Sequence, residues 1–499
     1  MQNLLKIVTV SSEVDPFSKT GGMADVTRSL SKALFRLGHS VIIITPFYEN
    51  IIDEKKFKLK CFQKDFSLKI DEKNILKIDL WKGELIEGLP VYFIGNKKFF
   101  YWKHQIKKSN QQLYGSKYEN ARFALFDLAT LQLLKLINFK PDIIQCHDWQ
   151  IGLIPYFFKK KLRFKNDPFF KETFTIFTIH NLVFQMGKNW WEIPVEQKDD
   201  GKNNLPFFDD PKLENINFAK RGILHSDIIN TVSERYAQEI LTSQFGQGMQ
   251  RILNSKKRDL YGIVNGIDST IFNPAFDKNI YFKYDWKTFR EEKKANKLAL
   301  QKETGLEKNF QIPLIGMTSR ITEQKGFNLI IENMVHLLHL NAQFVILGEG
   351  EKNFCDFLRK TAKKHPHKIA FYSTFSEKME SKIHAGSDML LLPSKFEPCG
   401  TAQLKSLRYG SIPIVHETGG LSDTITDFNP QTKQGNGFVF RRHWKEDLLI
   451  AITRALENYK YPKMWKYLVE KGMKQSYSWE LPAEKYVDLF RKALKKSNQ

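Results

Sequence analysis

The chain has 499 residues, of which 42% are hydrophobic and 26% charged, a composition that excludes a disordered protein. At roughly 100 to 200 residues per domain, this length predicts about two to four domains. The 77 Lys and Arg residues outnumber the 55 Asp and Glu residues, giving a formal charge of +22. Because lysines occur in almost every segment, the charge indicates a compositional bias and not a localised nucleic-acid site.

Cysteine usage and hydropathy suggest the cellular compartment. The four cysteines lie far apart and form no C-x-x-C pair, which weighs against a zinc site and a disulfide framework. The N-terminal residues lack the basic and apolar regions of a signal peptide. No apolar run approaches the roughly 20 residues that span a bilayer. We therefore expect a cytoplasmic protein with no membrane partner.

Short apolar runs alternate with helix-length segments through the first half of the chain, the pattern of a parallel sheet with crossover helices. A helix is predicted between the first two strands because Val26, Leu30 and Leu34 share one helical face, and Gly38 provides a stop. The expected strands cover residues 4–10, 40–48, 141–148, 174–181 and 227–233.

The alternation begins again after residues 262–274, so the second half is expected to hold its own sheet. The expected strands there cover residues 312–319, 342–350, 368–374, 388–394 and 411–417. The predicted fold class is α/β, with two Rossmann-like, doubly wound domains, 1–262 and 263–470, facing a central cleft. Ligands of such sheets bind outside the carboxyl ends of the strands, so residues at strand ends are the candidates for a site.

The first such motif, "SKTGGMADV", joins an expected strand to an expected helix. Gly21 and Gly22 would let backbone N–H groups approach an anion at the helix N-terminus, and Lys19 adds a positive charge. A tight turn without any ligand is the alternative, since the stretch matches neither G-x-G-x-x-G nor the P-loop pattern.

The second half repeats this arrangement in "TSRITEQKGF". Arg320 and Lys325 follow a strand and precede a helix, and can converge on one anion. A salt-bridged surface loop is the alternative. A pyrophosphate held by these two cations needs no metal, and the chain has no Asp-x-Asp pair to hold one. We therefore expect no metal and no other cofactor.

Two further strand ends in the second half carry polar motifs. Glu397 and Gly400 lie in "FEPCGT", where a carboxylate can accept hydrogen bonds from sugar hydroxyls and helix amides can face an anion. A helix-capping role is the alternative for Glu397. The segment Thr418, Gly419 and Gly420 then supplies a second Gly-Gly turn between a strand and a helix.

In the first half, "CHDWQIG" and "TIHNLVFQ" place polar side chains at two strand ends. They are His147 and Asp148 in the first motif, and His180 and Asn181 in the second. A lone histidine at such a place is more often structural. Two at successive strand ends favour polar contacts with a sugar.

Taken together, these segments resemble the bacterial glycogen synthase and plant starch synthase family of retaining glycosyltransferases, over nearly the whole chain. The motifs "KTGGMADV", "HDWQIGL", "TIHNLVFQ", "GIVNGID", "SRITEQKGF", "FEPCG" and "TGGLSDT" stand in the order typical of that family. Residues 471–499 contain "YSWELPAEKY", similar to a tail that packs back toward the first domain.

The resemblance implies a function. Such an enzyme transfers glucose from ADP-glucose to the non-reducing end of an α-1,4-glucan, with retention of anomeric configuration. Residues 1–262 would form the acceptor-side domain and residues 263–470 the nucleotide-sugar donor domain. The implied catalytic residues are Lys19, Asp148, His180, Arg320, Lys325 and Glu397. The implied substrate-binding residues are Glu13, Gly21, Gly22, Asn181, Cys399, Gly400, Thr418, Gly419 and Gly420.

Some positions depart from the family pattern beside the implied donor site, so donor affinity and base preference stay open. These positions are Thr401, Ala402, Lys405 and His416. UDP-glucose as donor, or another acceptor, is one alternative on the same fold. A non-catalytic glucan-binding or polyanion-binding protein, including one that binds nucleic acid, is the other.

The segment 97–115 is dense in aromatic and basic residues and is a candidate acceptor surface. Aromatic faces can stack on glucose rings, as they do on unstacked bases. Within it, Phe99 and Phe100 are expected in the core. Tyr101, Trp102 and Tyr114 are the better candidates for glucan contact.

Overall fold

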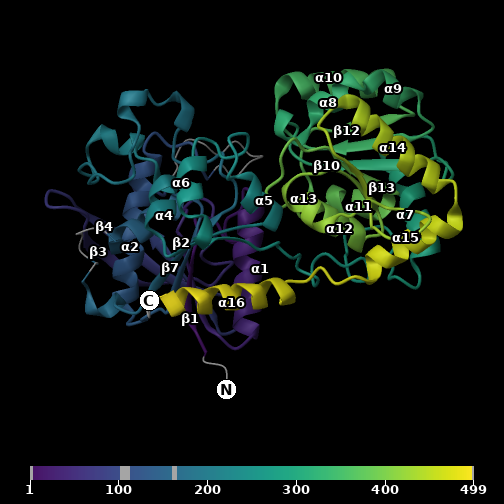
Figure 1. Ribbon diagram of the computed structural model, residues 1–499. Coiled ribbons are helices and arrows are strands. Elements are labelled where there is room, and N and C mark those ends of the chain that lie inside the picture. The colour runs from purple at the N-terminus through teal and green to yellow at the C-terminus, as the bar shows by residue number, and fades with distance from the viewer. Residues whose placement is uncertain (1–3, 102–112, 160–163, 165, 497–499) are drawn as a thin grey trace. The chain divides into compact units, whose positions relative to one another are not determined.

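The computed structural model describes residues 4–101, 113–159, 164 and 166–496 (Figure 1). The chain folds into two compact units. Unit 1 comprises Met1–Val232, Ala237–Ile263 and Trp479–Gln499, and unit 2 comprises Ser233–Tyr236 and Val264–Ser478. Both units are built on sheets made mostly of parallel strands, which confirms the predicted α/β fold class.

Unit 1 is built on a nine-stranded sheet whose order is β3-β4-β5-β2-β1-β6-β7-β8-β9. From β5 to the β9 edge of the sheet, each pair of adjacent strands is parallel. At the other edge, β3 and β4 form an antiparallel hairpin, and β4 is antiparallel to β5. The strands are β1 (Lys6–Val10), β2 (Ser40–Pro46), β3 (Lys60–Lys69), β4 (Ile75–Ile86), β5 (Leu89–Gly95), β6 (Ile143–His147), β7 (Phe174–Ile179), β8 (Ile228–Thr231) and β9 (Leu260–Gly262).

The helices of unit 1 connect these strands and cover the sheet. They are α1 (Gly22–Arg36), α2 (Glu119–Leu136), α3 (Leu153–Lys159), α4 (Phe218–His225), α6 (Gln250–Ser255) and α16 (Glu480–Lys495), while α5 (Glu234–Glu239) crosses the division between the units. The C-terminal helix α16 packs against α1 and β7, far from it in sequence. Phe490 and Tyr486 of α16 are fully buried, and the Tyr486 hydroxyl accepts a hydrogen bond from Asn230 at 3.2 Å.

Unit 2 is built on a six-stranded parallel sheet with the order β12-β11-β10-β13-β14-β15. Its strands are β10 (Leu314–Thr318), β11 (Gln343–Leu347), β12 (Ile369–Tyr372), β13 (Met389–Leu392), β14 (Ile412–His416) and β15 (Phe438–Phe440). Its helices are α7 (Phe289–Thr304), α8 (Phe327–Glu332), α9 (Met334–His339), α10 (Lys352–Lys364), α11 (Glu377–Gly386), α12 (Ala402–Arg408), α13 (Gly419–Thr424), α14 (Lys445–Tyr459) and α15 (Pro462–Lys474).

Alternating side chains of the unit 2 strands enter two separate cores. On β11, Phe344 and Ile346 pack with apolar residues of α8 and α14. Val345 and Leu347 point to the opposite face and pack with residues of α7 and α11. Helices therefore cover both faces of the sheet (Figure 1), which explains why its strands are continuous apolar runs in the sequence.

In each sheet there is one position at which the chain stops adding strands on one side and starts adding them on the other. In unit 1 the strands β1 and β6 are neighbours, but the chain continues from β1 to β2 on one side and from β6 to β7 on the other. In unit 2 the same reversal separates β10 from β13. Ligands of open α/β sheets bind outside the carboxyl ends of the strands at this switch point.

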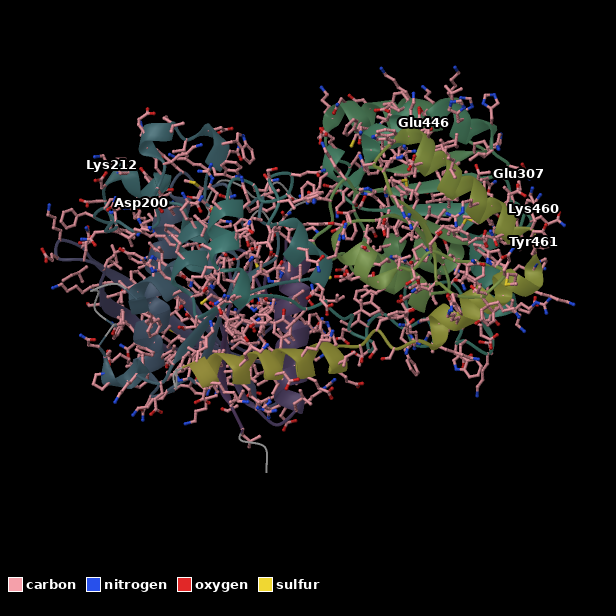
Figure 2. All side chains as sticks on the ribbon, viewed as in Figure 1. Asp200, Lys212, Glu307, Glu446, Lys460 and Tyr461 are labelled. Atoms are coloured by element: carbon pink, nitrogen blue, oxygen red, sulfur yellow. The ribbon has the colours of Figure 1, made fainter. Side chains whose placement is uncertain are left out.

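All ten expected strands are present, and the described residues contain five more that the sequence did not suggest. These are β3, β4, β5, β9 and β15. Within the described residues, none of the helices combines the length and apolar character needed to cross a membrane. Charged side chains such as Lys212, Glu307 and Lys460 project from the surfaces of the units (Figure 2), in keeping with a charge that is spread through the chain.

Candidate functional site

The switch point of unit 1 carries the first group of predicted residues. The loop that leaves β1 holds Glu13, which is only 3% exposed, and its Oε2 accepts hydrogen bonds from the Thr20 hydroxyl at 2.9 Å and the Gly21 amide at 3.3 Å. Burial raises the pKa of this carboxyl, while the same hydrogen bonds act in the opposite direction. Glu13 thus fixes the loop that carries the predicted glycines.

Helix α1 begins at Gly22 with Gly21 as its N-cap. A Cβ added to Gly22 would meet nothing within 4 Å, so the glycine leaves open space over the helix N-terminus. Such a terminus favours negative charge because its first amides point outward. Lys19 lies beside it and donates to Asp25 Oδ1 at 2.8 Å, an ion pair in which both side chains are about one-third exposed.

Asp148 follows β6, the strand beside β1, and its backbone is unusual. Its φ of 61° lies in the left-handed region, which non-glycine residues seldom adopt and which recurs at functional sites. Its Oδ1 accepts from the His180 amide at 2.9 Å, and the Asn181 amide also bonds to this carboxylate. Burial raises the pKa of Asp148 to about 7, and the charge of Glu13 adds to this effect. The structure therefore brings Asp148, His180 and Asn181 together.

The two strand-end histidines form a direct contact that the sequence alone did not reveal. His147 Nδ1 lies 2.8 Å from His180 Nε2, and the rings are stacked with centroids 5.1 Å apart. Burial lowers the pKa of His180 to about 3 and that of His147 well below its usual value. Both imidazoles are therefore neutral at physiological pH, and one must donate a proton to the other in this hydrogen bond.

The switch point of unit 2 carries the second group. Lys325 ends the short 3₁₀ helix η7 (Glu323–Lys325) after β10, and Glu397 lies in the loop after β13. The Lys325 ammonium donates to Glu397 Oε2, which also accepts from the Ser394 hydroxyl at 3.2 Å. Lys325 and Glu397, 72 residues apart, therefore form an ion pair with side chains 17% and 12% exposed.

Arg320 is less tightly held. It is exposed, and its guanidinium donates to Gln324 Oε1 at 3.3 Å, while the Gln324 amide donates to the Phe396 carbonyl at 3.4 Å. The described contacts thus connect Arg320 to the Glu397 loop through one intervening side chain. Gly326, which follows Lys325, has φ of 79°. A Cβ there would lie 2.0 Å from the Pro393 carbonyl oxygen, so only a glycine lets this turn pack against Pro393, just before the loop that carries Glu397.

The second Gly-Gly turn packs on the backbone around Glu397. The Gly420 amide donates to the Glu397 carbonyl at 3.1 Å, and a Cβ on Gly419 would lie 1.9 Å from that same oxygen. Thr418 is buried and serves as the N-cap residue of α13. The Cys399 thiol is buried as well, and burial raises its pKa to about 12, so it can contribute surface or backbone contacts but not a thiolate. Gly400 has φ of 70° and precedes α12.

The residues that depart from the family pattern are engaged within unit 2. Lys405 donates to Glu380 at 3.1 Å, and its ammonium lies 4.1 Å from the centre of the Phe272 ring. His416 Nδ1 lies 2.8 Å from the Ser394 carbonyl oxygen, and burial lowers the pKa of His416. Thr401 is the N-cap residue of α12, which begins at Ala402.

The candidate acceptor segment is only partly described. Phe99 and Phe100 are buried, which confirms their expected place in the core. Tyr101 is 37% exposed, whereas the Tyr114 hydroxyl lies 2.8 Å from the Ser12 hydroxyl, next to Glu13. Trp102 lies outside the described residues.

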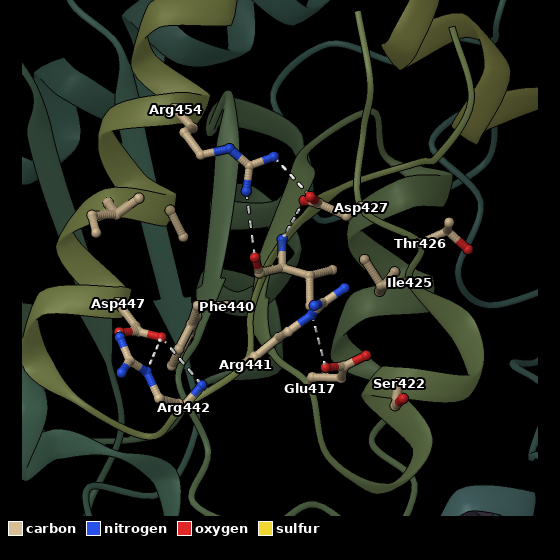
Figure 3. Close-up of a pocket in the computed structure, with 13 residues that line it drawn as sticks. Glu417, Ser422, Ile425, Thr426, Asp427, Phe440, Arg441, Arg442, Asp447 and Arg454 are labelled. Carbon is tan, nitrogen blue, oxygen red and sulfur yellow. Dashed lines mark hydrogen bonds and ion pairs between the residues drawn. The ribbon is translucent and has the colours of Figure 1, made fainter. Parts of the chain in front are cut away.

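A cavity of about 580 Å³ in unit 2 contains none of the predicted site residues (Figure 3). Arg441, Arg442 and Arg454 line it, and each is paired with a carboxylate, at 3.6, 2.8 and 2.8 Å respectively. These internal ion pairs account for the arginines. We therefore do not assign the cavity to the donor.

Comparisons with known proteins cover both units. Residues 6–255 match the family model of the starch synthase catalytic domain, and residues 301–472 match that of the glycosyl transferases group 1. The chain is 40% identical to the glycogen synthase of Geotalea daltonii over 507 aligned residues, covering 99% of this chain and all of the relative. It is also 40% identical to the glycogen synthase of Pseudothermotoga lettingae, with 99% of each chain covered.

Solved structures agree with this relationship. The catalytic domain of starch synthase IV from Arabidopsis thaliana, bound to ADP and acarbose, superposes with a TM-score of 0.84 at 32% identity, covering 99% of this chain and 100% of that one. Sucrose-phosphate synthase from Thermosynechococcus elongatus, at 14% identity and a TM-score of 0.58 over 99% of this chain and all of the other, shares the fold alone. This chain belongs to the glycogen synthase and starch synthase family, whose members are glycosyltransferases with the GT-B fold.

Proposed function

We propose that this protein is a glycogen synthase that transfers glucose from ADP-glucose to the non-reducing end of an α-1,4-glucan, with retention of configuration. The curated relatives named above are glycogen synthases matched over their full length. The solved relative from Arabidopsis was bound to ADP, the nucleotide that this reaction would release. The glucan acceptor and the nucleotide-sugar donor are the partners that the proposal requires.

One observation carries the proposal, namely the ion pair of Lys325 and Glu397 at the unit 2 switch point. Cleavage of the bond between sugar and phosphate places negative charge on the departing diphosphate. A preorganised cation near that oxygen stabilises the transition state, and such a group contributes about 100- to 1,000-fold in rate. We assign this role to Lys325 together with Arg320, and a sugar-binding role to Glu397.

The residues of unit 1 serve the same transfer in this proposal. The amides at Gly21 and Gly22, together with Lys19, would bind an anionic group of the donor. His180 and Asn181 would contact the sugar hydroxyls, and so would Asp148. The backbone around Cys399 and Gly400, and the turn Thr418, Gly419 and Gly420, would complete the donor contacts of unit 2.

Retention could also arise by double displacement, which needs a carboxylate nucleophile. Asp148 is the strand-end carboxylate considered for that role, and its pKa of about 7 leaves it largely protonated below neutral pH. A protonated carboxyl group is a poor nucleophile. We therefore propose that the acceptor hydroxyl attacks from the face that the diphosphate leaves, guided by the departing diphosphate. The bond from the sugar carbon to the diphosphate oxygen breaks as the bond to the acceptor oxygen forms, and the diphosphate takes up the hydroxyl proton.

The proposal includes no metal, because lysine and arginine would neutralise the charge of the diphosphate. It also places the protein in the cytoplasm. The location is favoured by four widely spaced cysteines, all of them free thiols.

The decisive experiment presents the purified protein with glycogen and either ADP-glucose or UDP-glucose, each labelled in the glucose. We expect label in the polymer with ADP-glucose and at least tenfold less with UDP-glucose. Transfer from UDP-glucose alone would contradict the donor assignment. Glycogen binding without transfer from either donor would favour a non-catalytic glucan-binding protein instead.

A further inference from the structure

Two histidines of unit 2 lie beside the start of the loop that carries Glu397. His416 is the last residue of β14, and His443 lies between β15 and α14. Their ring centroids are 5.1 Å apart and the rings meet edge to face. His416 is 7% exposed and is one of the positions that depart from the family pattern. The proposed transfer has so far assigned neither histidine a role.

Each histidine contacts a backbone carbonyl oxygen of the two residues that follow β13. His416 Nδ1 lies 2.8 Å from the Ser394 carbonyl oxygen, and His443 Nε2 lies 3.0 Å from the Pro393 carbonyl oxygen. Because a carbonyl oxygen can only accept a hydrogen bond, the ring nitrogen must donate in each contact. Ser394 is 1% exposed, and a buried carbonyl group without a partner costs free energy. The two rings therefore fix consecutive carbonyl groups of one segment.

The protonation of the rings decides which contact His416 makes. Burial lowers the pKa of His443 to about 4 and also lowers the pKa of His416. Each ring is therefore neutral at physiological pH and has a single N–H group to donate. The other nitrogen of His416, Nε2, lies 3.3 Å from the Arg441 carbonyl oxygen. Since the contact with Ser394 is the shorter one, we place the proton on Nδ1.

The segment that the histidines bind touches both members of the ion pair at the proposed donor site. The Ser394 hydroxyl donates to Glu397 Oε2 at 3.2 Å, and the same oxygen accepts from the Lys325 ammonium. The turn after Lys325 packs on the other carbonyl group, since a Cβ on Gly326 would lie 2.0 Å from the Pro393 oxygen. A shift of this segment would therefore disturb the ion pair from both sides.

Other contacts hold the middle of the loop. The Gln324 carbonyl oxygen accepts from the Lys395 amide at 2.8 Å, and the Gln324 side chain donates to the Phe396 carbonyl at 3.4 Å. Neither contact involves the two carbonyl groups that the histidines bind. The histidines thus act on the start of the loop, and Gln324 acts on the residues next to Glu397.

We propose that His416 is a positioning residue for the glucosyl transfer and acts with His443 through the segment 393–394. The two rings hold Glu397 and Lys325 in the geometry that the reaction needs. This inference rests on the proposed function and gives a role to a position that departs from the family pattern. Neither ring is assigned a contact with the substrate.

Amide replacements separate the two nitrogens of His416. His416→Asn places an amide near Nδ1 and can keep the contact with Ser394, whereas His416→Gln reaches the position of Nε2. His416→Phe keeps a ring against Phe440 and removes both contacts. We expect the Gln and Phe variants to lower kcat by about 10-fold or more, because a misplacement of about 1 Å can cost about 100-fold. His416→Asn should retain most of the wild-type rate. The KM for glycogen should be unchanged in all three variants.

The order of the two amides should be reversed at His443, because this ring donates through Nε2. His443→Gln should retain most of the wild-type kcat, and His443→Asn should lose it. A role in stability alone predicts no such reversal. Equal kcat values for the folded Asn and Gln variants of His416 would overturn the inference. This comparison also holds if His416→Phe fails to fold.

His339 is a matched control, because it is an exposed histidine of α9 whose Nδ1 lies 2.7 Å from the Val335 carbonyl oxygen. It shares the type of contact but not the loop. His339→Phe should leave kcat unchanged. A loss of kcat in His339→Phe equal to that in His416→Phe would overturn the inference, and melting temperatures verify that each variant is folded.

Labelling of lysines with acetic anhydride, followed by mass spectrometry, tests the inference without measuring activity. The Lys325 side chain is 17% exposed and paired with Glu397, so a displaced loop should let it react faster. We expect at least about twofold faster labelling of Lys325 in His416→Gln than in wild type, because local opening governs access. Lys460, which pairs with Glu457 at 2.6 Å on α14, should react equally in both proteins. Equal labelling of Lys325 would contradict the inference.

The two measurements separate this inference from the proposed function. If wild type transfers glucose and His416→Gln matches it in kcat and in Lys325 labelling, the histidine does not position the pair and the function stands. If wild type transfers no glucose but Lys325 reacts faster in His416→Gln, the histidine holds the pair and the proposed activity is wrong.

Discussion

His147 Nδ1 and His180 Nε2 lie 2.8 Å apart at the ends of two neighbouring parallel strands, β6 and β7. Burial keeps both rings neutral by lowering their pKa values. The other ring nitrogen of His147, Nε2, has no hydrogen-bond partner among the described residues. The contact of Nδ1 with His180 is therefore the one that orients the pair. His147 thus acts on the proposed sugar site through His180.

Loss of this contact should impair catalysis without unfolding the protein. We expect His147→Phe to lower kcat by about 10-fold or more, by analogy with groups that orient metal-binding histidines, whose loss typically costs about 10- to 100-fold. His147→Asn places an amide near the position of Nδ1 and should restore part of the rate. Initial-rate kinetics with glycogen and ADP-glucose measure both. Equal loss in the two variants would contradict an orienting role.

Asp148 should make stability depend on pH in a defined direction. Burial raises its pKa from 3.8 to about 7, so between these values the folded state binds a proton that the unfolded state has released. This stabilising contribution is complete below about pH 4 and is lost as the pH rises to 7. Asp148→Asn stays neutral, so its melting temperature relative to wild type should increase from pH 5 to pH 8. A difference that is constant across this range would contradict the raised pKa.

Lys325→Ala should lower kcat about 100- to 1,000-fold if the ammonium stabilises the departing diphosphate. Lys395→Ala is the matched control, since Lys395 pairs with Glu323 at 2.8 Å near the same loop but both side chains are more than half exposed. The control should keep near-normal turnover. Near-normal turnover of Lys325→Ala would remove that lysine from the mechanism.

Activity should survive chelation. The proposed donor site relies on Lys325 and Arg320 to meet the charge of the diphosphate, so dialysis against EDTA should change kcat by less than twofold. Addition of Mg²⁺ afterward should have no further effect. A loss of activity that Mg²⁺ reverses would show that a cation completes the site.

The C-terminal helix should be required for the stability of unit 1. Phe490 on α16 is fully buried, and Phe490→Ala should cost about 3 to 5 kcal/mol in the free energy of unfolding. Leu481, at the start of the same helix, is 62% exposed, and Leu481→Ala should change stability by about 0.5 kcal/mol or less. Urea denaturation followed by tryptophan fluorescence compares the two. Equal effects would show that α16 contributes little packing energy.

The ten predicted strands, all of which pair in parallel, could be identified because strands buried on both faces are continuous apolar runs. The strands β5, β9 and β15 also pair in parallel with a neighbour but were missed. The hairpin of β3 and β4 could not be predicted in this way. β3 is almost wholly exposed, and β4 has only two buried residues, Ile78 and Leu80, with the rest partly or fully exposed. A search for apolar runs does not detect such strands.

The candidate site residues could be named from the sequence because they stand at strand ends, but their partners depend on the topology. Lys325 meets Glu397 because β10 and β13 are neighbours in the sheet, although 72 residues separate the two side chains. Likewise, the contact of His147 with His180 follows from the parallel pairing of β6 and β7.

The most direct test of the proposed chemistry is the transfer of labelled glucose from ADP-glucose to glycogen. It compares the purified wild-type protein with the Lys325→Ala and Lys395→Ala variants. We predict labelled polymer with wild type and with Lys395→Ala, and at most about one-hundredth of that rate with Lys325→Ala. Equal rates for all three proteins, or no labelled polymer with wild type, would show that Lys325 does not drive such a transfer.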